Sequence, residues 1–223
     1  VDTMEGHPLA LDQAGAFIES RKASIQEYLD YYEIAKEKLL QERGELSDNH
    51  SSVTITFSLN FQEINESSVA AGDLLRVSSF LSPDTIPEEI FIEGALELGE
   101  NLSIVRANKI ELLNTIREVC TFSLIDRNRH NQTLNIHRLV QHVLRDEMTS
   151  KVRCSWINRI VNAVDIVFPD VRFETWEKCS RLLPHAIAVI EHANQAAVES
   201  ESLGRLLSKT GEFCTHQGQY DTA

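Results

Sequence analysis

The stretch FSLIDRNRHNQTLNIHRLVQHVL, Phe122–Leu144, decides the fold of this chain because its apolar period changes twice. Residues 122–127 alternate in the manner of a short strand, residues 128–132 are polar in the manner of a turn, and residues 133–136 can run back as a second strand. Helical spacing returns immediately afterwards, with apolar side chains at Leu139, Val140, Val143 and Leu144. The stretch therefore predicts a β-hairpin that leads directly into a helix.

Upstream of this hairpin the apolar spacing predicts three helices. The first passes through Leu74 and Phe80 and stops at Ser82-Pro83-Asp84, the second starts at Pro87, and the third opens at Asn108. Ile90, Phe91 and Leu96 would line the second helix, and Ile110, Leu113, Ile116 and Val119 the third. Three helices followed by a hairpin give the outline of a winged helix, which we assign to residues 73–150.

Residues 1–72 predict a small helical bundle. The segment GHPLALDQAGAFI, Gly6–Ile18, combines a tight turn, a proline suited to a first helical turn and an apolar helix. Ser24 and Glu27 form a capping box that opens a second helix, and Gly44 is placed to end it. The apolar face of this second helix would hold Ile25, Tyr28, Leu29, Tyr32, Ala35, Leu39 and Leu40. A polar loop at 45–52, a β-prone run at 53–57 and a short helix capped by Asn60 and Glu63 would follow.

Residues 151–223 predict a helical connector and the first half of a tetratricopeptide repeat. A helix containing Trp156 and Ile160 ends at Pro169, and Thr175 can cap the next, in which Pro184 predicts a kink or a break. Near the end, Gly211, Gly218, Tyr220 and Ala223 have the spacing of a tetratricopeptide repeat. One such unit cannot bury its apolar face alone, so we expect further repeats after it.

The composition is that of an acidic globular protein. The net charge of −13 divides into −8 for residues 1–72 (5 basic, 13 acidic), −4 for 73–150 (8 and 12) and −1 for 151–223 (8 and 9). No part carries the basic surplus that phosphate backbones require, so nucleic acid is not an expected partner. No segment approaches the roughly 18 consecutive apolar residues of a membrane span, and the four separated cysteines indicate buried thiols in a reducing, cytoplasmic environment.

The sequence contains no Walker, Rossmann, zincin or serine-hydrolase motif, and no pair of acids stands out, so we expect no catalysis by this chain. The spacing of His142, His185 and His192 is poor for a metal site, and we interpret them as ordinary surface or core histidines. His137 differs because it lies where the second strand turns into a helix. A helix N-terminus attracts anions, so this imidazole could reach a phosphate; the alternative is a capping or packing role.

The order of these features resembles that of the STAND signal-transduction NTPases of the NB-ARC type with tetratricopeptide repeats. The order is GHPLAL, a helical bundle, a winged helix ending in IHRLVQ, and helical repeats. The likeness covers nearly the whole chain. The family's G-x-P motif, whose proline packs near the adenine, matches Gly6-His7-Pro8. The histidine of its Met-His-Asp motif, which touches the β-phosphate of ADP, matches His137, between Ile136 and Arg138. Arginine in place of the family's aspartate is a departure.

This resemblance implies that the chain is a fragment of a nucleotide-dependent switch and lacks the P-loop domain. The implied cofactor is ADP or ATP in the full-length parent, with none expected in the fragment. The implied nucleotide-binding residues are Pro8 and His137. The implied partners are the missing nucleotide-binding domain of the same chain, a protein or peptide ligand at the repeats, and further copies of the protein in an oligomer formed on activation.

Two other interpretations stay open. One is a transcription regulator whose winged helix binds DNA, which the acidic balance opposes. The other is a scaffold in which helical repeats hold a peptide and no nucleotide takes part. A P-loop within about 200 residues upstream of Val1 would favour the switch, a distance set by the usual size of a domain.

Overall fold

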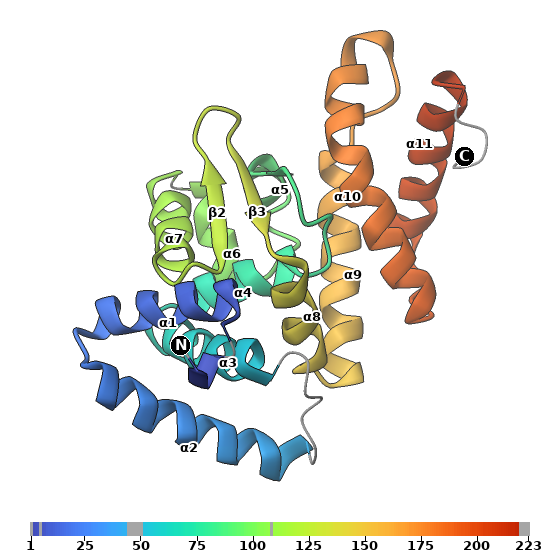
Figure 1. Ribbon diagram of the computed structural model, residues 1–223. Coiled ribbons are helices and arrows are strands. Elements are labelled where there is room, and N and C mark those ends of the chain that lie inside the picture. The colour runs from blue at the N-terminus through green and yellow to red at the C-terminus, as the bar shows by residue number, and fades with distance from the viewer. Residues whose placement is uncertain (1, 5, 44–50, 108, 219–223) are drawn as a thin grey trace.

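A computed structural model describes residues 2–4, 6–43, 51–107 and 109–218. Its architecture is mainly helical with one small antiparallel sheet, as the sequence predicts (Figure 1). Within these residues, no helix is long and apolar enough to cross a membrane.

The N-terminal region consists of η1 (Asp2–Met4), α1 (Pro8–Arg21), α2 (Ile25–Arg43) and α3 (Ser51–Ser67). The predicted capping box is present, since Ser24 N donates to Glu27 Oε2 at 2.6 Å and Glu27 N donates to Ser24 Oγ at 3.2 Å. Helices α1 and α2, together with η1 and the start of α3, enclose a small apolar core that we call the N-terminal cluster. It is formed by Met4, Ala10, Ala14, Phe17, Tyr28, Tyr32, Leu39, Val53 and Ile55.

The predicted strand at 53–57 is wrong, because these residues lie inside α3. Val53, Thr54, Ile55, Thr56 and Phe57 are all buried, so burial on several sides of a helix overrides their β propensity. The Thr56 hydroxyl donates to the carbonyl of Ser52 at 2.8 Å, which meets its hydrogen-bonding need within the helix.

Three further predictions for this region need correction or fall outside the described residues. Asn60 does not cap a helix but lies within α3, where its amide donates to Gln13 O at 3.1 Å. Ser51 and Ser52 belong to α3 and not to a loop, while Gly44 and residues 45–50 lie outside the described residues. On α2, Ile25 is 71% exposed and Leu40 is 40% exposed, so neither belongs to the buried face.

The middle region runs through α4 (Val69–Ser78), β1 (Ile86–Pro87), α5 (Glu89–Glu93), α6 (Glu100–Ala107), α7 (Lys109–Thr121), β2 (Ile125–Asn128), β3 (Thr133–Ile136) and α8 (Arg138–Asp146). The hairpin is confirmed, with Ile125 opposite Ile136 and Asn128 opposite Thr133. Its first strand is Ile125–Asn128 and not residues 122–127, so Asn128 belongs to the strand and not to the turn. The strand order is β1-β3-β2, so the hairpin adds its second strand to β1. The elements thus follow the predicted order of helices and then a hairpin, with an additional strand.

Three further details of the middle region differ from the prediction. Pro87 lies in β1, opposite Thr133, and the helix starts two residues later at Glu89. A proline is tolerated in this edge strand because its missing N–H costs no ladder bond there. The segment before α7 forms a separate helix, α6, and Asn108 lies outside the described residues. Leu96 and Ile110, expected on apolar faces, are 58% and 65% exposed.

The C-terminal region contains α9 (Ser150–Val167), η2 (Phe173–Thr175), α10 (Trp176–Gln195) and α11 (Glu201–His216). Helix α10 continues through Pro184, so the predicted break is absent. Ser180 and Pro184 both lie on the exposed side, where water can reach a carbonyl that has no helical donor. Gly218 follows α11 with φ +72°, as expected for a helix end. Tyr220 and Ala223 lie outside the described residues, and the tetratricopeptide repeat stays a prediction.

One large apolar core, here the main cluster, joins the middle and C-terminal regions. It extends from Phe57 and Ile64 in α3 through Phe91 and Ile160 to Phe213 in α11. Figure 1 shows α9, α10 and α11 standing beside the sheet, and α9 packs against α4, α5, α10 and α11. The predicted boundaries at residues 72 and 150 stay predictions, and apolar packing continues across both.

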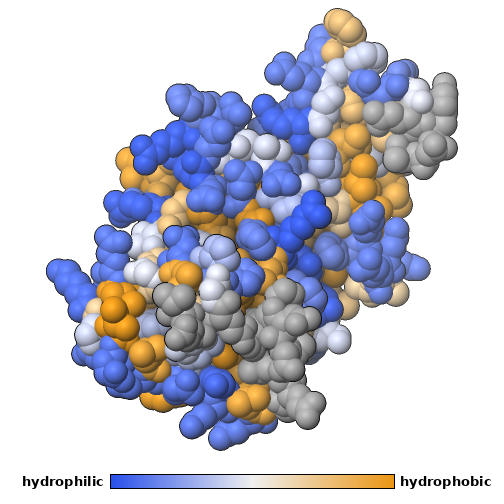
Figure 2. Space-filling model, viewed as in Figure 1, coloured by the Kyte–Doolittle hydropathy of each residue, from blue (hydrophilic) through white to orange (hydrophobic). Residues whose placement is uncertain are grey.

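Ion pairs add to this connection between the middle and C-terminal regions. Arg181 Nη2 lies 2.7 Å from Glu89 Oε1, and Lys178 Nζ lies 2.8 Å from Glu93 Oε2, so α10 is bound to α5. Within the C-terminal region, Lys209 Nζ on α11 lies 3.0 Å from the buried carboxylate of Asp165 on α9. Hydrophilic residues cover much of the surface in Figure 2, with apolar side chains gathered at the lower left and along the C-terminal helices.

Candidate functional site

Pro8 occupies the first position of α1 and is exposed to solvent. The chain reaches it through a turn in which Gly6 has φ +68° and His7 N donates to Met4 O at 2.9 Å. A positive φ is a conformation that glycine adopts without strain. The buried side chain of Met4 fixes this turn to the N-terminal cluster. The predicted turn and helix start at Gly6–Pro8 are therefore present.

His137 is exposed at the N-cap of α8, directly after β3. Its Nδ1 accepts a hydrogen bond from the backbone N–H of Leu139 at 3.1 Å. A neutral imidazole that accepts at Nδ1 carries its proton at Nε2, which makes Nε2 the donor. The capping role that the sequence left open is confirmed, and a contact with phosphate through Nε2 stays a prediction.

The two candidate residues are attached to the same small core. Leu9, next to Pro8, and Leu139, two residues after His137, both pack against the N-terminal cluster. Pro8 and His137 are themselves exposed, and a shared nucleotide site for the two residues stays a prediction. Arg138, at the position of the family's aspartate, is also exposed.

The other histidines have the ordinary roles that the sequence predicts. His142 is exposed and its Nδ1 lies 2.8 Å from Asp146 Oδ2. His185 is fully buried with Nε2 3.2 Å from Thr85 O, and burial lowers its pKa to about 4. His192 packs edge-on against Phe80, with ring centroids 5.3 Å apart.

Metal binding and thiol chemistry find no support in the part of the chain that the structure describes. No group of three or more His, Cys, Asp or Glu side chains there could hold a metal ion. All four cysteines are free; Cys179 and Cys214 are buried as predicted, whereas Cys120 and Cys154 are half-buried. Burial raises the pKa of the Cys120 thiol to about 11, so it is protonated and a poor nucleophile at neutral pH.

Helix α7, which precedes the hairpin, gives no support to DNA binding. Its sequence contains two bases, Lys109 and Arg117, and two acids, Glu111 and Glu118. A helix that enters the major groove usually presents a surplus of positive charge to the phosphates.

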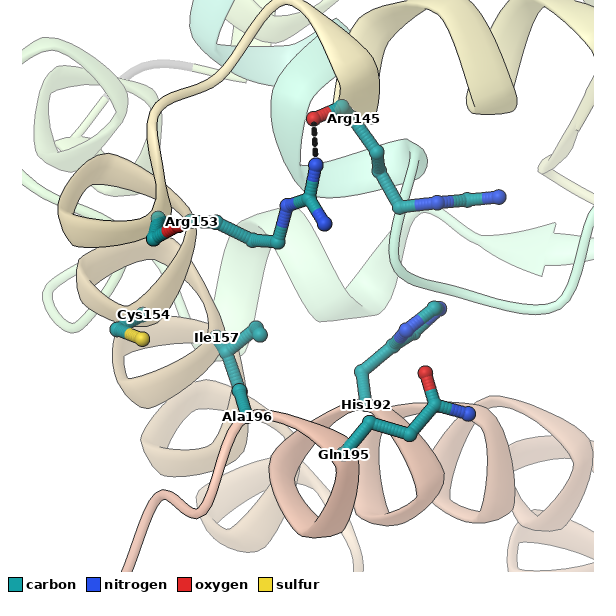
Figure 3. A pocket seen from close by; sticks show the side chains of 8 residues that line it. Arg145, Arg153, Cys154, Ile157, His192, Gln195 and Ala196 are labelled. Atoms are coloured by element: carbon teal, nitrogen blue, oxygen red, sulfur yellow. Dashed lines mark hydrogen bonds between the residues drawn. The ribbon is translucent and has the colours of Figure 1, made fainter.

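A cavity that sequence reasoning missed lies between α8, α9 and α10 (Figure 3). Its volume is about 300 Å³, and its lining consists of Arg145, Ser150, Arg153, Cys154, Ile157, His192, Gln195 and Ala196. Arg145 and Arg153 are eight residues apart across a helix joint, and His192 comes about 40 residues later. No short motif joins residues at such separations, and the sequence therefore carried no signal for this group.

Comparisons with known proteins find a match to a family model and a distant similarity to a longer protein. Residues 59–153 match the model of a domain of unknown function, DUF7779. Over 97% of its length, the chain is 26% identical to a nucleotide-binding leucine-rich repeat (NLR)-like protein of Hyaloscypha variabilis. The chain spans 22% of the length of that relative. No solved structure matches the chain. The chain is thus similar, over nearly its whole length, to one part of an NLR-like protein.

Proposed function

We propose that this chain is the regulatory part of a nucleotide-dependent NLR-type signalling switch, in which His137 contacts the phosphate of ADP and holds the resting state. The observation that carries the proposal is the placement of His137, exposed on the first turn of α8 with its ring oriented by the Leu139 N–H. The similarity of nearly the whole chain to a protein named for nucleotide binding supports it.

The chemistry of this helix start suits an anion. The first N–H groups of a helix have no intrahelical acceptor, and the helix dipole places positive charge beside them. A donor at His137 Nε2 and the guanidinium of Arg138 would add to this field. The arginine that replaces the family's aspartate would therefore favour a phosphate and not oppose it. Pro8, attached to the same cluster, would face the adenine.

The nucleotide itself would be held by a nucleotide-binding domain that precedes Gly6 in the parent protein. His137 would respond to its state, and α8 would transmit the response because Val140, Val143 and Leu144 belong to the main cluster. Helices α9, α10 and α11 share that cluster, so the middle and C-terminal regions would move together. A protein or peptide ligand at C-terminal repeats would trigger the movement, and the opened protein would oligomerise.

The chain alone should have no enzymatic activity and little nucleotide affinity, because the proposed switch takes most of its affinity from the P-loop domain. Isothermal titration of ADP into residues 1–223 should give no micromolar binding, and a phosphate-release assay should detect no ATP hydrolysis. Micromolar ADP affinity in this chain would contradict the proposal that the P-loop domain supplies most of the nucleotide affinity.

The role of His137 can be tested in the full-length parent with two histidine variants. His137→Ala should reduce the ADP that remains bound after purification and shift the protein toward larger assemblies in light scattering. His142→Ala is the matched control, because His142 is exposed on the same helix and pairs with Asp146. If His137→Ala keeps the same amount of bound ADP and the same assembly size as His142→Ala, His137 has no part in the switch.

A further inference from the structure

We propose that the cavity between α8, α9 and α10 binds the phosphate group of a small phosphorylated molecule, at a site separate from His137. Arg145 lies eight residues after His137 on one helix. At a rise of 1.5 Å per residue, about 12 Å of helix separates the two positions. One phosphate group therefore cannot contact both the cavity and the first turn of α8.

Charge is the first argument for an anion. Arg145 and Arg153 both line the cavity, and none of the described residues that line it is acidic. The nearest carboxylate recorded for Arg153 is Asp146, at 4.0 Å, which also pairs with His142 at 2.8 Å. Two arginines concentrated at one cavity are unexpected in a chain of net charge −13. A bound anion would neutralise them.

Unmet hydrogen-bonding capacity is the second argument. Nε of Arg153 is buried and has no partner among the described residues, although its Nη2 donates to Arg145 O. Nη1 of Arg145 donates to Ser79 O. The pKa of the Arg145 guanidinium is lowered, mainly by burial. The charge of Asp146 opposes this shift, and the charge of Arg153 adds to it. Burial, Arg145 and Arg153 together lower the pKa of His192 to about 4. The cavity thus holds two guanidinium groups that no carboxylate among the described lining residues balances, and a His192 imidazole that is neutral at pH 7.5.

The arrangement of donors is the third argument, and it favours phosphate over a flat carboxylate. Figure 3 shows the Arg145 and Arg153 guanidinium groups across the cavity from His192 and Gln195, which lie on α10. Ser150, the first residue of α9, adds the N-terminal end of that helix. Donors from several directions suit the tetrahedral oxygens of a phosphate, and arginine is well suited to such contacts.

The size and the mixed lining indicate a small molecule. A cavity of about 300 Å³ is at the lower end of the usual range for small-molecule sites, about 300–1,000 Å³. Ile157 and Ala196 provide apolar surface for the part of the ligand that carries the phosphate. Because the lining comes from α8, α9 and α10, a bound ligand would hold the end of the middle region against the C-terminal helices.

The test is isothermal titration of inorganic phosphate and of glucose 6-phosphate into residues 1–223 at pH 7.5 and constant ionic strength. We expect saturable binding of both probes, with glucose 6-phosphate the tighter. Arg153→Gln should weaken binding at least tenfold. The matched control is Arg129→Gln, an exposed arginine of the hairpin turn, which should change affinity less than twofold.

A second variant keeps the test decisive if Arg153→Gln does not fold. Gln195 is exposed at the cavity, so Gln195→Glu adds one negative charge with little change of shape. It should weaken binding at least threefold. The proposal would be overturned if neither probe showed saturable binding. It would also be overturned if Arg153→Gln or Gln195→Glu bound the probes as tightly as Arg129→Gln does.

Two further titrations define the ligand class and the separateness of the site. A phosphoserine tetrapeptide should bind more weakly than glucose 6-phosphate, and tenfold tighter binding would overturn the assignment to a small molecule. His137→Ala should leave phosphate affinity unchanged. An equal loss in His137→Ala and Arg153→Gln would show that the two positions serve one site and would contradict the proposal.

Discussion

The N-terminal and main clusters differ in how completely their helices are enclosed. In the N-terminal region, α2 buries Tyr28, Tyr32 and Leu39 but leaves Ile25 71% and Ile34 65% exposed. In the main cluster, Leu74, Phe91 and Ile160 are 0% exposed and are surrounded by helices on several sides. The part from α4 to α11, here the body, therefore has a fully enclosed core, although Ile110 and Ile166 on its surface are exposed, whereas α2 is covered on one face.

Within the described residues, buried polar groups without a partner occur in both regions. Both side-chain polar atoms of the buried Gln13 have no partner among the described residues, and neither does Oδ1 of Asn60. Each buried group without a partner costs about 1–3 kcal/mol. The body holds such atoms as well, at Thr133 Oγ1, Arg153 Nε and His185 Nδ1, and its buried carboxylate at Glu88 receives two hydrogen bonds from Arg127, at 2.6 and 3.0 Å. Because the N-terminal cluster is the smaller core and one face of α2 is uncovered, we expect the N-terminal region to be the less stable of the two.

The largest expected effect comes from opening the main cluster. Phe91→Ala removes a fully buried ring and should reduce the free energy of unfolding by about 3–5 kcal/mol. Because the cluster extends from α3 to α11, urea unfolding should report one transition for the whole body. Ile34→Ala on the exposed face of α2 is the control and should change stability by less than about 0.5 kcal/mol. A separate transition for α9–α11 would show that the body is not one unit.

The comparison also explains what the sequence could predict. The hairpin of β2 and β3 was predictable because its signals are local: the change from helical to alternating apolar spacing, and the polar turn. Asn128 Oδ1 accepts from the N–H groups of His130 and Asn131, which is the usual behaviour of an asparagine at the start of a turn. His137 was placed at a helix start for the same local reason.

The errors arose where distant packing decides the structure. Residues 53–57 have β-prone side chains, but burial between the N-terminal helices and the body makes them helical. β1 has two residues and exists through its pairing with β3, which no local pattern reveals. The cavity between α8, α9 and α10 collects residues from separate helices, and only the folded chain brings them together.

The second-largest expected effect is a loss of folding stability at low pH. Burial lowers the pKa of His185 to about 4, below the 6.5 of the unfolded chain, so the unfolded chain binds this proton first. The stability that His185 contributes is complete above pH 6.5 and is lost as the pH falls from 6.5 toward 4. At about 1.4 kcal/mol per pKa unit, the loss is at most about 3.5 kcal/mol.

The matched variant for this effect is His185→Gln, which can still donate to Thr85 O. The difference in unfolding free energy between pH 7.5 and pH 4.5 should be about 2 kcal/mol smaller in this variant than in the wild type. Urea titrations at the two pH values give this difference. Equal differences in the two proteins would mean that His185 is not buried in its neutral form.

The smallest effect should be confined to the N-terminal region. Ser24→Ala removes the hydroxyl that accepts from Glu27 N, and loss of such a cap costs about 1 kcal/mol. Hydrogen exchange should accelerate in α1 and α2 and stay unchanged in α9. Faster exchange in α9 as well would contradict the division of the molecule into a closed body and a less stable N-terminal region.

The most direct test of the proposed switch is the rate at which a fluorescent ADP analogue leaves the full-length parent. His137 at the start of α8 is proposed to donate to the nucleotide phosphate, and loss of such a charged hydrogen bond is worth about 1.5–3 kcal/mol. His137→Ala should therefore accelerate ADP release by about ten- to a hundredfold, with His142→Ala unchanged. Equal release rates in wild type and His137→Ala would contradict the account.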